Sequence, residues 1–332
     1  MKPLPAHRRR LLQALAASGC GVGLTAAGLP ARAQQWPAKP IRIINPWPPG
    51  GPADAIARPV IEKASQLLGQ QIVMESRSGA NGMIGTELVS KASGDGYTLL
   101  LSHAGPTAIS PALRKNMPYR TLDDFQHITL LAAPTIVLVI RPDLPYRDLQ
   151  GLIAWGKANP AKLTYGSVGP GSTTHLASVM LEMMSGIKTV HVPYKGAAPV
   201  VTDLLGGQLD FAFLGNAAVA GHVQAGKLRL IATASPHRSA VAASTPAVSE
   251  TLPGFQVVSW YGLAAPAATP AAIVDRVYQA FAAALKDPEV RAKLEQTGSD
   301  PGGMSPADFT AIIRSDIDRW EKVVAAAGLP KE

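Results

Sequence analysis

Two stretches of the chain share one pattern: residues 41–54 read IRIINPWPPGGPAD, and residues 163–175 read LTYGSVGPGSTTH. In each, an apolar run typical of a β-strand leads into a Gly- and Pro-rich loop and then into a helical pattern. The first turn of a helix has unpaired backbone N–H groups and the positive end of the helix dipole, so it favours an anion. The sequence therefore predicts two anion-binding loops, in opposite halves of the chain, that can close on one ligand.

An ordinary strand-to-helix turn has the same pattern, and the pattern alone leaves that alternative open. In it, Asp54 and Ser172 serve only as caps of the helices that follow. In the binding interpretation, glycines let the backbone approach a ligand and prolines stiffen the loop. The hydroxyl groups of Ser167, Ser172 and Thr173 then add hydrogen-bond donors.

Strand-like and helix-like runs alternate along the rest of the chain, which predicts an α/β protein. Further strands are expected at residues 71–75, 97–102, 137–140, 190–192, 211–214 and 228–233, and helices at residues 54–68 and 149–157 and after Ser172. Near the C-terminus, Thr269 followed by Pro270 is typical of a helix N-cap and its first helical position.

Composition limits the class of protein. The chain has 332 residues, of which 47% are hydrophobic and 16% charged, so it predicts a globular protein of about two domains. No run of about 18 uninterrupted apolar residues follows the N-terminal segment, so the body is not expected to span a membrane. The formal charge is +8, but residues 1–33 hold five basic residues and no acid, which leaves 26 basic against 23 acidic residues. Without a basic cluster in that remainder, we expect no binding to nucleic acid.

Residues 1–33 are typical of an export signal, because three arginines at residues 8–10 precede an apolar stretch at residues 11–29. We expect cleavage near Ala33 and a periplasmic mature protein. The single cysteine, Cys20, lies in a weak lipobox, so lipidation there is the alternative. The arginines suit both the general and the twin-arginine export routes. Cleavage near Ala33 would leave no cysteine and hence no disulfide.

The sequence contains no motif that indicates catalysis: G-x-S-x-G, H-E-x-x-H, the Walker loop and G-x-G-x-x-G are all missing. The seven histidines show no metal-ligand spacing, and no pair of carboxylates stands out. We therefore expect a protein that is not an enzyme and that holds no cofactor or metal. A hidden Ser-His-Asp set that uses Ser172 and His175 is the enzymatic alternative.

Several motifs, in order from Trp36 almost to the C-terminus, carry a resemblance to a known family. They are WPAKPIRII at 36–44, PPGG at 48–51, GANGMIG at 79–85, DGYTLL at 95–100, HVPYKG at 191–196, DLLGGQLD at 203–210 and GLAAP at 262–266. With them the chain resembles the Bug-type, TctC-like periplasmic solute-binding receptors of tripartite tricarboxylate transporters. The stretch at residues 191–196 is the most specific of these motifs.

The resemblance implies an α/β fold of the two-lobed periplasmic-binding-protein type, type 2 like, with two crossing strands as hinge and the ligand in the interlobe cleft. It implies lobe 1 at residues 34–132 and 252–332 and lobe 2 at residues 133–251. It also implies a small mono-, di- or tricarboxylate as ligand, membrane transporter subunits as partners, and a monomer. The alternatives are a secreted enzyme on the same scaffold and the ligand-binding subunit of a sensor system.

The loops and the resemblance together nominate the ligand-binding residues. In lobe 1 they are Trp47, Pro49, Gly50, Gly51, Ala53, Asp54 and Ser102, and in lobe 2 they are Ser167, Gly169, Ser172, Thr173, His175, Asp210 and Asn216. The resemblance implies that Asp210 and Asn216 belong to the pocket floor. Ala53 lacks the hydroxyl that many members have, and Trp47 stands where Phe is common, so no particular ligand is carried over.

Overall fold

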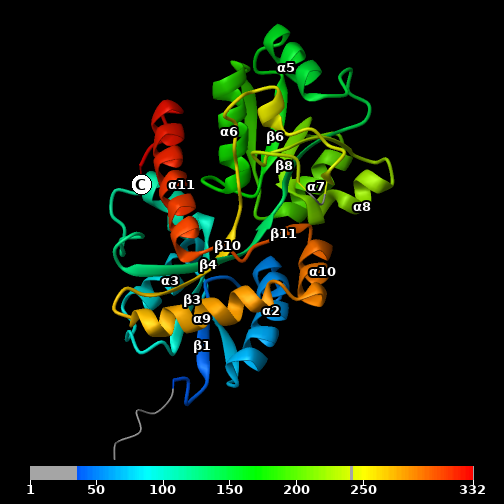
Figure 1. Ribbon diagram of the computed structural model, residues 1–332. Coiled ribbons are helices and arrows are strands. Elements are labelled where there is room, and N and C mark those ends of the chain that lie inside the picture. The colour runs from blue at the N-terminus through cyan, green and yellow to red at the C-terminus, as the bar shows by residue number, and fades with distance from the viewer. Residues whose placement is uncertain (1–35, 240–241, 332) are drawn as a thin grey trace, which may run out of the picture. The chain divides into compact units, whose positions relative to one another are not determined.

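The computed structural model describes residues 36–239 and 242–331, so the predicted export signal and Cys20 lie outside the described residues. The chain divides into residues 1–38 and a compact unit, Lys39–Glu332, which contains two β-sheets (Figure 1). The fold described below is that of the compact unit.

The first sheet has six strands in the order β11-β4-β10-β3-β1-β2. They are β1 (Ile41–Asn45), β2 (Ile72–Ser76), β3 (Thr98–His103), β4 (Phe125–Pro134), β10 (Tyr261–Pro266) and β11 (Ser299–Pro301). Strand β1 pairs in parallel with β2 and β3, whereas β10 lies antiparallel between β3 and β4. We call this sheet and its helices lobe 1.

The second sheet has five strands in the order β7-β6-β8-β5-β9. They are β5 (Ile136–Ile140), β6 (Leu163–Ser167), β7 (Thr189–Pro193), β8 (Phe211–Gly215) and β9 (Arg229–Thr233). Strand β6 pairs in parallel with β7 and β8, and β5 lies antiparallel between β8 and β9. This sheet and its helices form lobe 2, which repeats the arrangement of lobe 1: three parallel strands followed by an antiparallel strand.

Helices pack on both sheets (Figure 1). Lobe 1 has α2 (Pro52–Leu68), η1 (Ala80–Gly82), α3 (Met83–Ser90), η2 (Gly105–Ile109), α4 (Ser110–Leu113), α9 (Ala271–Ala284), α10 (Pro288–Gln296) and α11 (Pro306–Ala326). Lobe 2 has α5 (Leu149–Ala158), α6 (Thr173–Ser185), α7 (Ala197–Leu205) and α8 (Asn216–Gln224), and η4 (Val248–Glu250) follows β9. In the part of the chain that the structure describes, no helix combines the length and the apolar character needed to cross a membrane.

The apolar stripe predicted for the first helix faces the core of lobe 1. Ile56, Val60 and Ala64 on α2 are buried, as their spacing of four residues requires. Burial of one such aliphatic side chain contributes about 1.5–3 kcal/mol, so this face holds α2 on the sheet. The helix begins at Pro52, two residues before the predicted start, because proline has no N–H to lose at the first position of a helix.

The structure confirms some of the other expected elements and differs from the rest. Strand β6 has the predicted bounds, and Ser172 is the N-cap of α6, which confirms both predictions. The cap predicted at Thr269 is wrong: Pro270 occupies the N-cap position with extended backbone, and α9 begins at Ala271. The sequence did not predict the ten-residue strand β4, because its polar residues at positions 126, 127 and 129 do not alternate regularly with its apolar ones.

The chain crosses between the sheets twice. In the first crossing, Thr135 alone separates β4 from β5. In the second, the chain runs back into lobe 1 through residues 255–260, where the N–H of Val257 donates to the carbonyl of Ala234 at 2.9 Å. The predicted lobe boundaries, after residues 132 and 251, remain a prediction.

Glycine at position 85 allows α3 to pack on the loop that follows β1. A Cβ at Gly85 would lie 2.7 Å from the carbonyl oxygen of Arg77 and 3.0 Å from Pro46, and backbone atoms cannot move aside cheaply. We expect Gly85→Ala to lower the free energy of unfolding by roughly 1–3 kcal/mol, as overpacking does. Gly221, in helix α8, has nothing within 4 Å of an added Cβ, so Gly221→Ala is a matched control. It should be neutral or stabilise by up to about 1 kcal/mol. Urea unfolding that finds Gly85→Ala as stable as Gly221→Ala would contradict this packing argument.

Candidate functional site

The loop between β1 and α2, residues 46–51, is organised by the carboxylate of Asp54. Its Oδ1 accepts a hydrogen bond from Asn45 Nδ2 at 2.9 Å, and its Oδ2 accepts from the N–H of Gly50 at 2.9 Å and from Arg58 Nη2 at 2.8 Å. Gly50 has φ of 79°, a conformation that glycine adopts without strain, and this turn points its N–H at Asp54. We call residues 46–51 loop 1.

The charge of Asp54 is compensated inside lobe 1. Burial alone would raise the pKa of Asp54, but the hydrogen bonds from Gly50 and Arg58 outweigh burial and lower it below its ordinary value. The side chain is only 7% exposed, and both of its oxygens are bound by neighbours. The nomination of Asp54 as a ligand-binding residue is therefore corrected: it holds loop 1 in place.

With Asp54 occupied, loop 1 presents backbone donors. Within the described residues, the N–H groups of Gly51 and Ala53, at the start of α2, have no hydrogen-bond partner. A cavity of about 470 Å³ lies over the loop. It is lined by Trp47, Pro48, Pro49, Gly50, Gly51, Pro52, Ala53, His103 and Tyr261. The structure thus brings together five of the seven nominated lobe 1 residues, without Asp54 and Ser102.

The loop between β6 and α6, residues 168–172, is also held by its own hydrogen bonds. Ser172 Oγ accepts from the N–H of His175 at 3.2 Å and donates to the carbonyl of Gly169 at 2.6 Å. The N–H of Gly171 donates to His175 Nδ1 at 3.2 Å. We call residues 168–172 loop 2. In it, Ser172 caps α6 and also fixes the loop through its hydrogen bond to Gly169.

Loop 2 leaves the next residue free to bind. Within the described residues, the N–H groups of Thr173 and Thr174 have no hydrogen-bond partner, and the hydroxyl of Thr173 has none either. These donors stand at the N-terminus of a 13-residue helix, where the helix dipole favours negative charge. Of the hydroxyl donors that the sequence assigned to Ser167, Ser172 and Thr173, the hydroxyl of Thr173 is therefore the one left without a partner within the described residues.

Behind loop 2, aromatic and histidine rings form a stack. The rings of His175 and His191 lie 4.2 Å apart between centroids, and Tyr165 stacks on His191 at 4.9 Å. Burial lowers the pKa of His191, and burial together with the nearby His191 lowers the pKa of His175 to about 4. Ser167 is fully buried, with its Oγ 2.7 Å from His191 Nε2. The nomination of Ser167 is corrected accordingly: its hydroxyl supports the stack and is not open to a ligand.

A second cavity, of about 560 Å³, lies between the two lobes. From lobe 1 it is lined by Asn81, Ser110, Leu113, Arg114, Leu329 and Pro330, and from lobe 2 by Pro170, Gly171 and His175. Asn81 also lies close to Gly105, and Gly82 packs against Trp47, so the wall of this cavity continues toward loop 1. Loop 2 borders this interlobe cavity, whereas the cavity over loop 1 is lined by residues of lobe 1.

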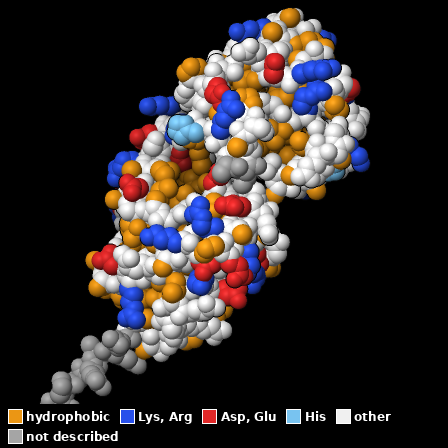
Figure 2. All heavy atoms as spheres, turned by 45° about the vertical axis from the view of Figure 1, so that its right-hand side comes forward, with side chains coloured by type: hydrophobic (Ala, Val, Ile, Leu, Met, Phe, Trp, Pro, Cys, Tyr) orange, Lys and Arg blue, Asp and Glu red, His pale blue; other side chains and the backbone are white. Residues whose placement is uncertain are grey.

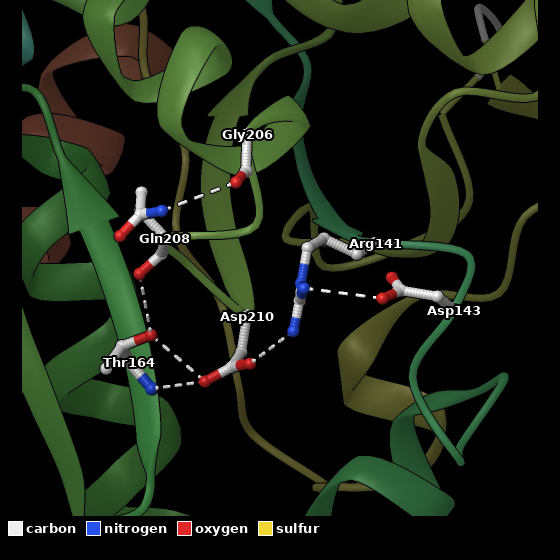
Figure 3. Close-up of polar contacts among 6 residues, drawn as sticks. All are labelled: Arg141, Asp143, Thr164, Gly206, Gln208 and Asp210. Atoms are coloured by element: carbon white, nitrogen blue, oxygen red, sulfur yellow. Dashed lines mark hydrogen bonds and ion pairs between the residues drawn. The ribbon is translucent and has the colours of Figure 1, made fainter.

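Asp210 lies away from both loops. It precedes β8, which runs parallel to β6, so it is at the opposite end of the sheet from loop 2. Figure 3 shows its carboxylate bound on both sides: Arg141 Nη2 donates at 3.1 Å, and the N–H and hydroxyl of Thr164 donate at 2.8 and 3.0 Å. The nomination of Asp210 for the pocket floor is corrected, because this carboxylate ties β8 to β6.

Two further nominated residues, Ser102 and Asn216, line neither cavity. Ser102 is fully buried within β3 and lines neither cavity, so its nomination stays a prediction. Asn216 does begin α8 at the same edge of the sheet as loop 2, but its N–H donates to the carbonyl of Thr135 at 2.8 Å, and it lines neither cavity.

Several cavity residues were missed by the sequence reasoning. Asn81 stands inside the quoted motif GANGMIG, so a signal for it existed. His103 directly follows the nominated Ser102 in the sequence. Tyr261 and Arg114 had no sequence signal, since each reaches its cavity only through tertiary packing.

The described residues offer no metal centre: among residues 36–239 and 242–331, no three His, Cys, Asp or Glu side chains gather as metal ligands would. On the face drawn in Figure 2, Lys and Arg side chains are interspersed with Asp and Glu and form no continuous basic stripe. The polar groups left for a ligand at the two loops are therefore neutral N–H and hydroxyl donors at two helix N-termini.

Comparison with known proteins identifies the family. The model of the tripartite tricarboxylate transporter family receptor matches residues 56–329. The chain belongs to this receptor family. BugT of Bordetella pertussis is 34% identical over 312 residues, which cover 93% of this chain and 96% of BugT.

Solved structures agree with the receptor's fold. Rpa4515 of R. palustris with adipate has a TM-score of 0.76 and 32% identity, covering 88% of this chain and 98% of that one. MatC from Rhodopseudomonas palustris with bound malate has a TM-score of 0.72 and 29% identity, covering 87% and 100%. The predicted family and the two-lobed periplasmic-binding-protein fold are thereby confirmed.

The bonds of Asp54 make the stability of the receptor depend on this carboxylate and on pH. Asp54→Asn removes the charge-assisted bonds of loop 1 and should lower the free energy of unfolding by about 1.5–3 kcal/mol at pH 7. Because the pKa of Asp54 is lowered by folding, its contribution is complete above the ordinary value of 3.8 and is lost as the pH falls through the folded value.

Denaturant titrations of both proteins from pH 7 down to pH ~3.5 measure this difference. Asp143→Asn is the control, because Asp143 is 68% exposed and its ion pair with Arg141 is long, at 3.4 Å. A difference between wild type and Asp54→Asn that grows toward low pH would contradict the assignment.

Proposed function

We propose that this receptor is exported to the periplasm, captures a small carboxylate between its two lobes, and delivers it to a tripartite tricarboxylate-type transporter. The observation that carries the proposal is the pair of helix N-termini. The N–H groups of Gly51 and Ala53 in lobe 1 and of Thr173 and Thr174 in lobe 2 have no partner within the described residues. Loop 2 lines the interlobe cavity, and loop 1 lies under a cavity of lobe 1 toward which the wall of the interlobe cavity continues. The related structures of Rpa4515 with adipate and of MatC with bound malate support a carboxylate as the ligand class.

Binding by hinge closure follows from how the donors are divided. Each lobe offers only part of the set, so a ligand that uses both loops stabilises a closed arrangement over an open one. The crossing at Thr135, one residue long between two strands, is a short hinge. Export by cleavage near Ala33 and a monomeric receptor complete the proposal, and the periplasmic family supports the location.

The arrangement of the serines and histidines supports a receptor without catalysis. Ser172 Oγ accepts from the backbone N–H of His175, and His175 Nδ1 accepts from Gly171, so this serine and this imidazole do not activate each other. Ser167 does contact His191, but it is fully buried and out of reach of a substrate. The solute-binding function of the family agrees with this reading.

A thermal-shift screen tests the ligand class. Residues 34–332 are unfolded and refolded to remove any bound ligand, and are then screened against carboxylic acids, amino acids, sugars and phosphorylated metabolites. A carboxylate at about 100 times its Kd should stabilise the protein by about 2.7 kcal/mol and raise Tm by roughly 4–5 °C. Sugars and phosphates should leave Tm unchanged, because loop 1 and loop 2 carry no Lys or Arg to hold a phosphate. A shift by sugars or phosphates with none by carboxylates would refute the proposal.

Substitutions of two neighbouring hydroxyl residues in lobe 2, Thr173 and Ser172, should have separate effects on ligand binding and on protein stability. Thr173→Val removes a free hydroxyl of similar shape and should weaken binding of the carboxylate found in the screen roughly tenfold, with little change in Tm. Ser172→Ala removes a cap and should lower the free energy of unfolding by about 1 kcal/mol. Thr202→Val, at an exposed helical position on α7, is the control. Calorimetric titration with a melting curve for each variant distinguishes these effects. If Thr173→Val binds as tightly as Thr202→Val, Thr173 is not a ligand contact.

A further inference from the structure

Three aromatic rings from separate segments form one wall of the cavity over loop 1. Trp47 comes from loop 1, His103 from the end of β3 and Tyr261 from the start of β10. The rings of Trp47 and His103 meet edge to face, with centroids 5.1 Å apart at 80°. Those of His103 and Tyr261 lie 4.6 Å apart at 52°. We call these three residues the aromatic wall.

The aromatic wall is fixed before any ligand binds. Tyr261 and His103 are direct partners in the antiparallel register of β10 and β3. The backbone N–H of Trp47 donates to Asn45 Oδ1 at 3.1 Å. Its indole has close contacts with the His103 ring and with Gly82, where an added Cβ would lie 3.4 Å from the ring. A pre-formed surface costs a ligand little ordering entropy.

The lining of this cavity carries no charge. Burial lowers the pKa of His103 to about 4, so its ring is neutral at pH 7. The N–H of Gly105 donates to His103 Nδ1 at 3.0 Å, which leaves the ring hydrogen on Nε2. Burial also raises the pKa of Tyr261, so its hydroxyl stays protonated. The remaining lining residues are prolines, glycines and an alanine. Such a surface suits the uncharged body of a ligand, and its few polar groups do not match the many hydroxyls of a sugar.

We propose that the ligand is an aromatic carboxylate, whose ring packs on the aromatic wall while its acid group is bound by the free N–H groups of the two helix N-termini. This inference rests on the proposed function. Trp47 is the specificity-determining residue, because it presents the largest apolar surface of the wall. Edge-to-face contacts between aromatic rings favour an aromatic ligand over a saturated ring of similar size.

Calorimetric titration of refolded residues 34–332 with benzoate, cyclohexanecarboxylate and adipate tests this ligand class. Benzoate should bind roughly 3- to 10-fold more tightly than cyclohexanecarboxylate, the range of an aromatic pair beyond its buried area. It should also bind more tightly than adipate. Binding of adipate without binding of benzoate would overturn this inference and leave the proposed function standing. If none of these three acids binds while another carboxylate of the thermal-shift screen does, this inference is overturned and the proposed function stands; if no carboxylate of that screen binds either, both are refuted.

Variants of Trp47 test the assigned residue. Trp47→Leu keeps an apolar side chain but removes the ring, and should abolish the preference for benzoate over cyclohexanecarboxylate, while Trp47→Phe should largely restore it. Trp155→Leu, in α5 of lobe 2 beside Tyr146, is the matched control and should keep the preference. Melting curves establish that each variant folds. A preference for benzoate that survives Trp47→Leu would show that the aromatic wall does not select the ligand.

Discussion

The two-lobed arrangement depends on how one buried residue, Thr135, is bonded where the chain crosses between the sheets. Its N–H donates to the carbonyl of Gly298 at 3.0 Å, and its carbonyl accepts from the N–H of Asn216 at 2.8 Å. Its hydroxyl lies 2.7 Å from that of Ser239, which in turn donates to Asp300 at 2.9 Å. Buried backbone groups need such partners, so the crossing joins elements of both lobes at one point. Strand β4 enters the crossing in the same direction as β1 and β3, because β10 lies antiparallel to both β3 and β4. Strand β5 leaves the crossing antiparallel to β6 and β8. The parallel strands of both sheets therefore end on the side of the crossing.

The second constraint is that each loop binds its own polar side chains and leaves its backbone donors free. The carboxylate of Asp54 accepts hydrogen bonds from Asn45, Gly50 and Arg58. The hydroxyl of Ser172 is hydrogen-bonded to the backbone of Gly169 and His175. A carboxylate ligand would then meet oriented N–H groups and the hydroxyl of Thr173 in place of a second carboxylate. Donors that are already oriented lower the entropic cost of binding, and their division between two lobes couples binding to closure.

Much of the fold followed from local sequence pattern, because strands such as β6 and caps such as Ser172 are determined within a few residues. The site was predictable only in part. His103 and Tyr261 are 158 positions apart and meet through the register of β3 and β10, which no local pattern reveals. Asp210 stands in a quoted motif, but a motif does not say which end of a strand faces the ligand. Similarly, the polarity of Asp54 pointed to binding, whereas its role depends on a hydrogen-bond network that only the folded loop creates.

The central claim is that a carboxylate is held between loop 1 and loop 2 by neutral donors at two helix N-termini. A crystal structure of the mature protein with its carboxylate bound measures this directly. The account predicts the acid oxygens within hydrogen-bond distance of the N–H groups of Gly51 or Ala53 and of Thr173 or Thr174, with the two lobes closed around the ligand. A carboxylate bound outside the interlobe space, or held only by Lys or Arg side chains with these N–H groups facing water, would contradict it.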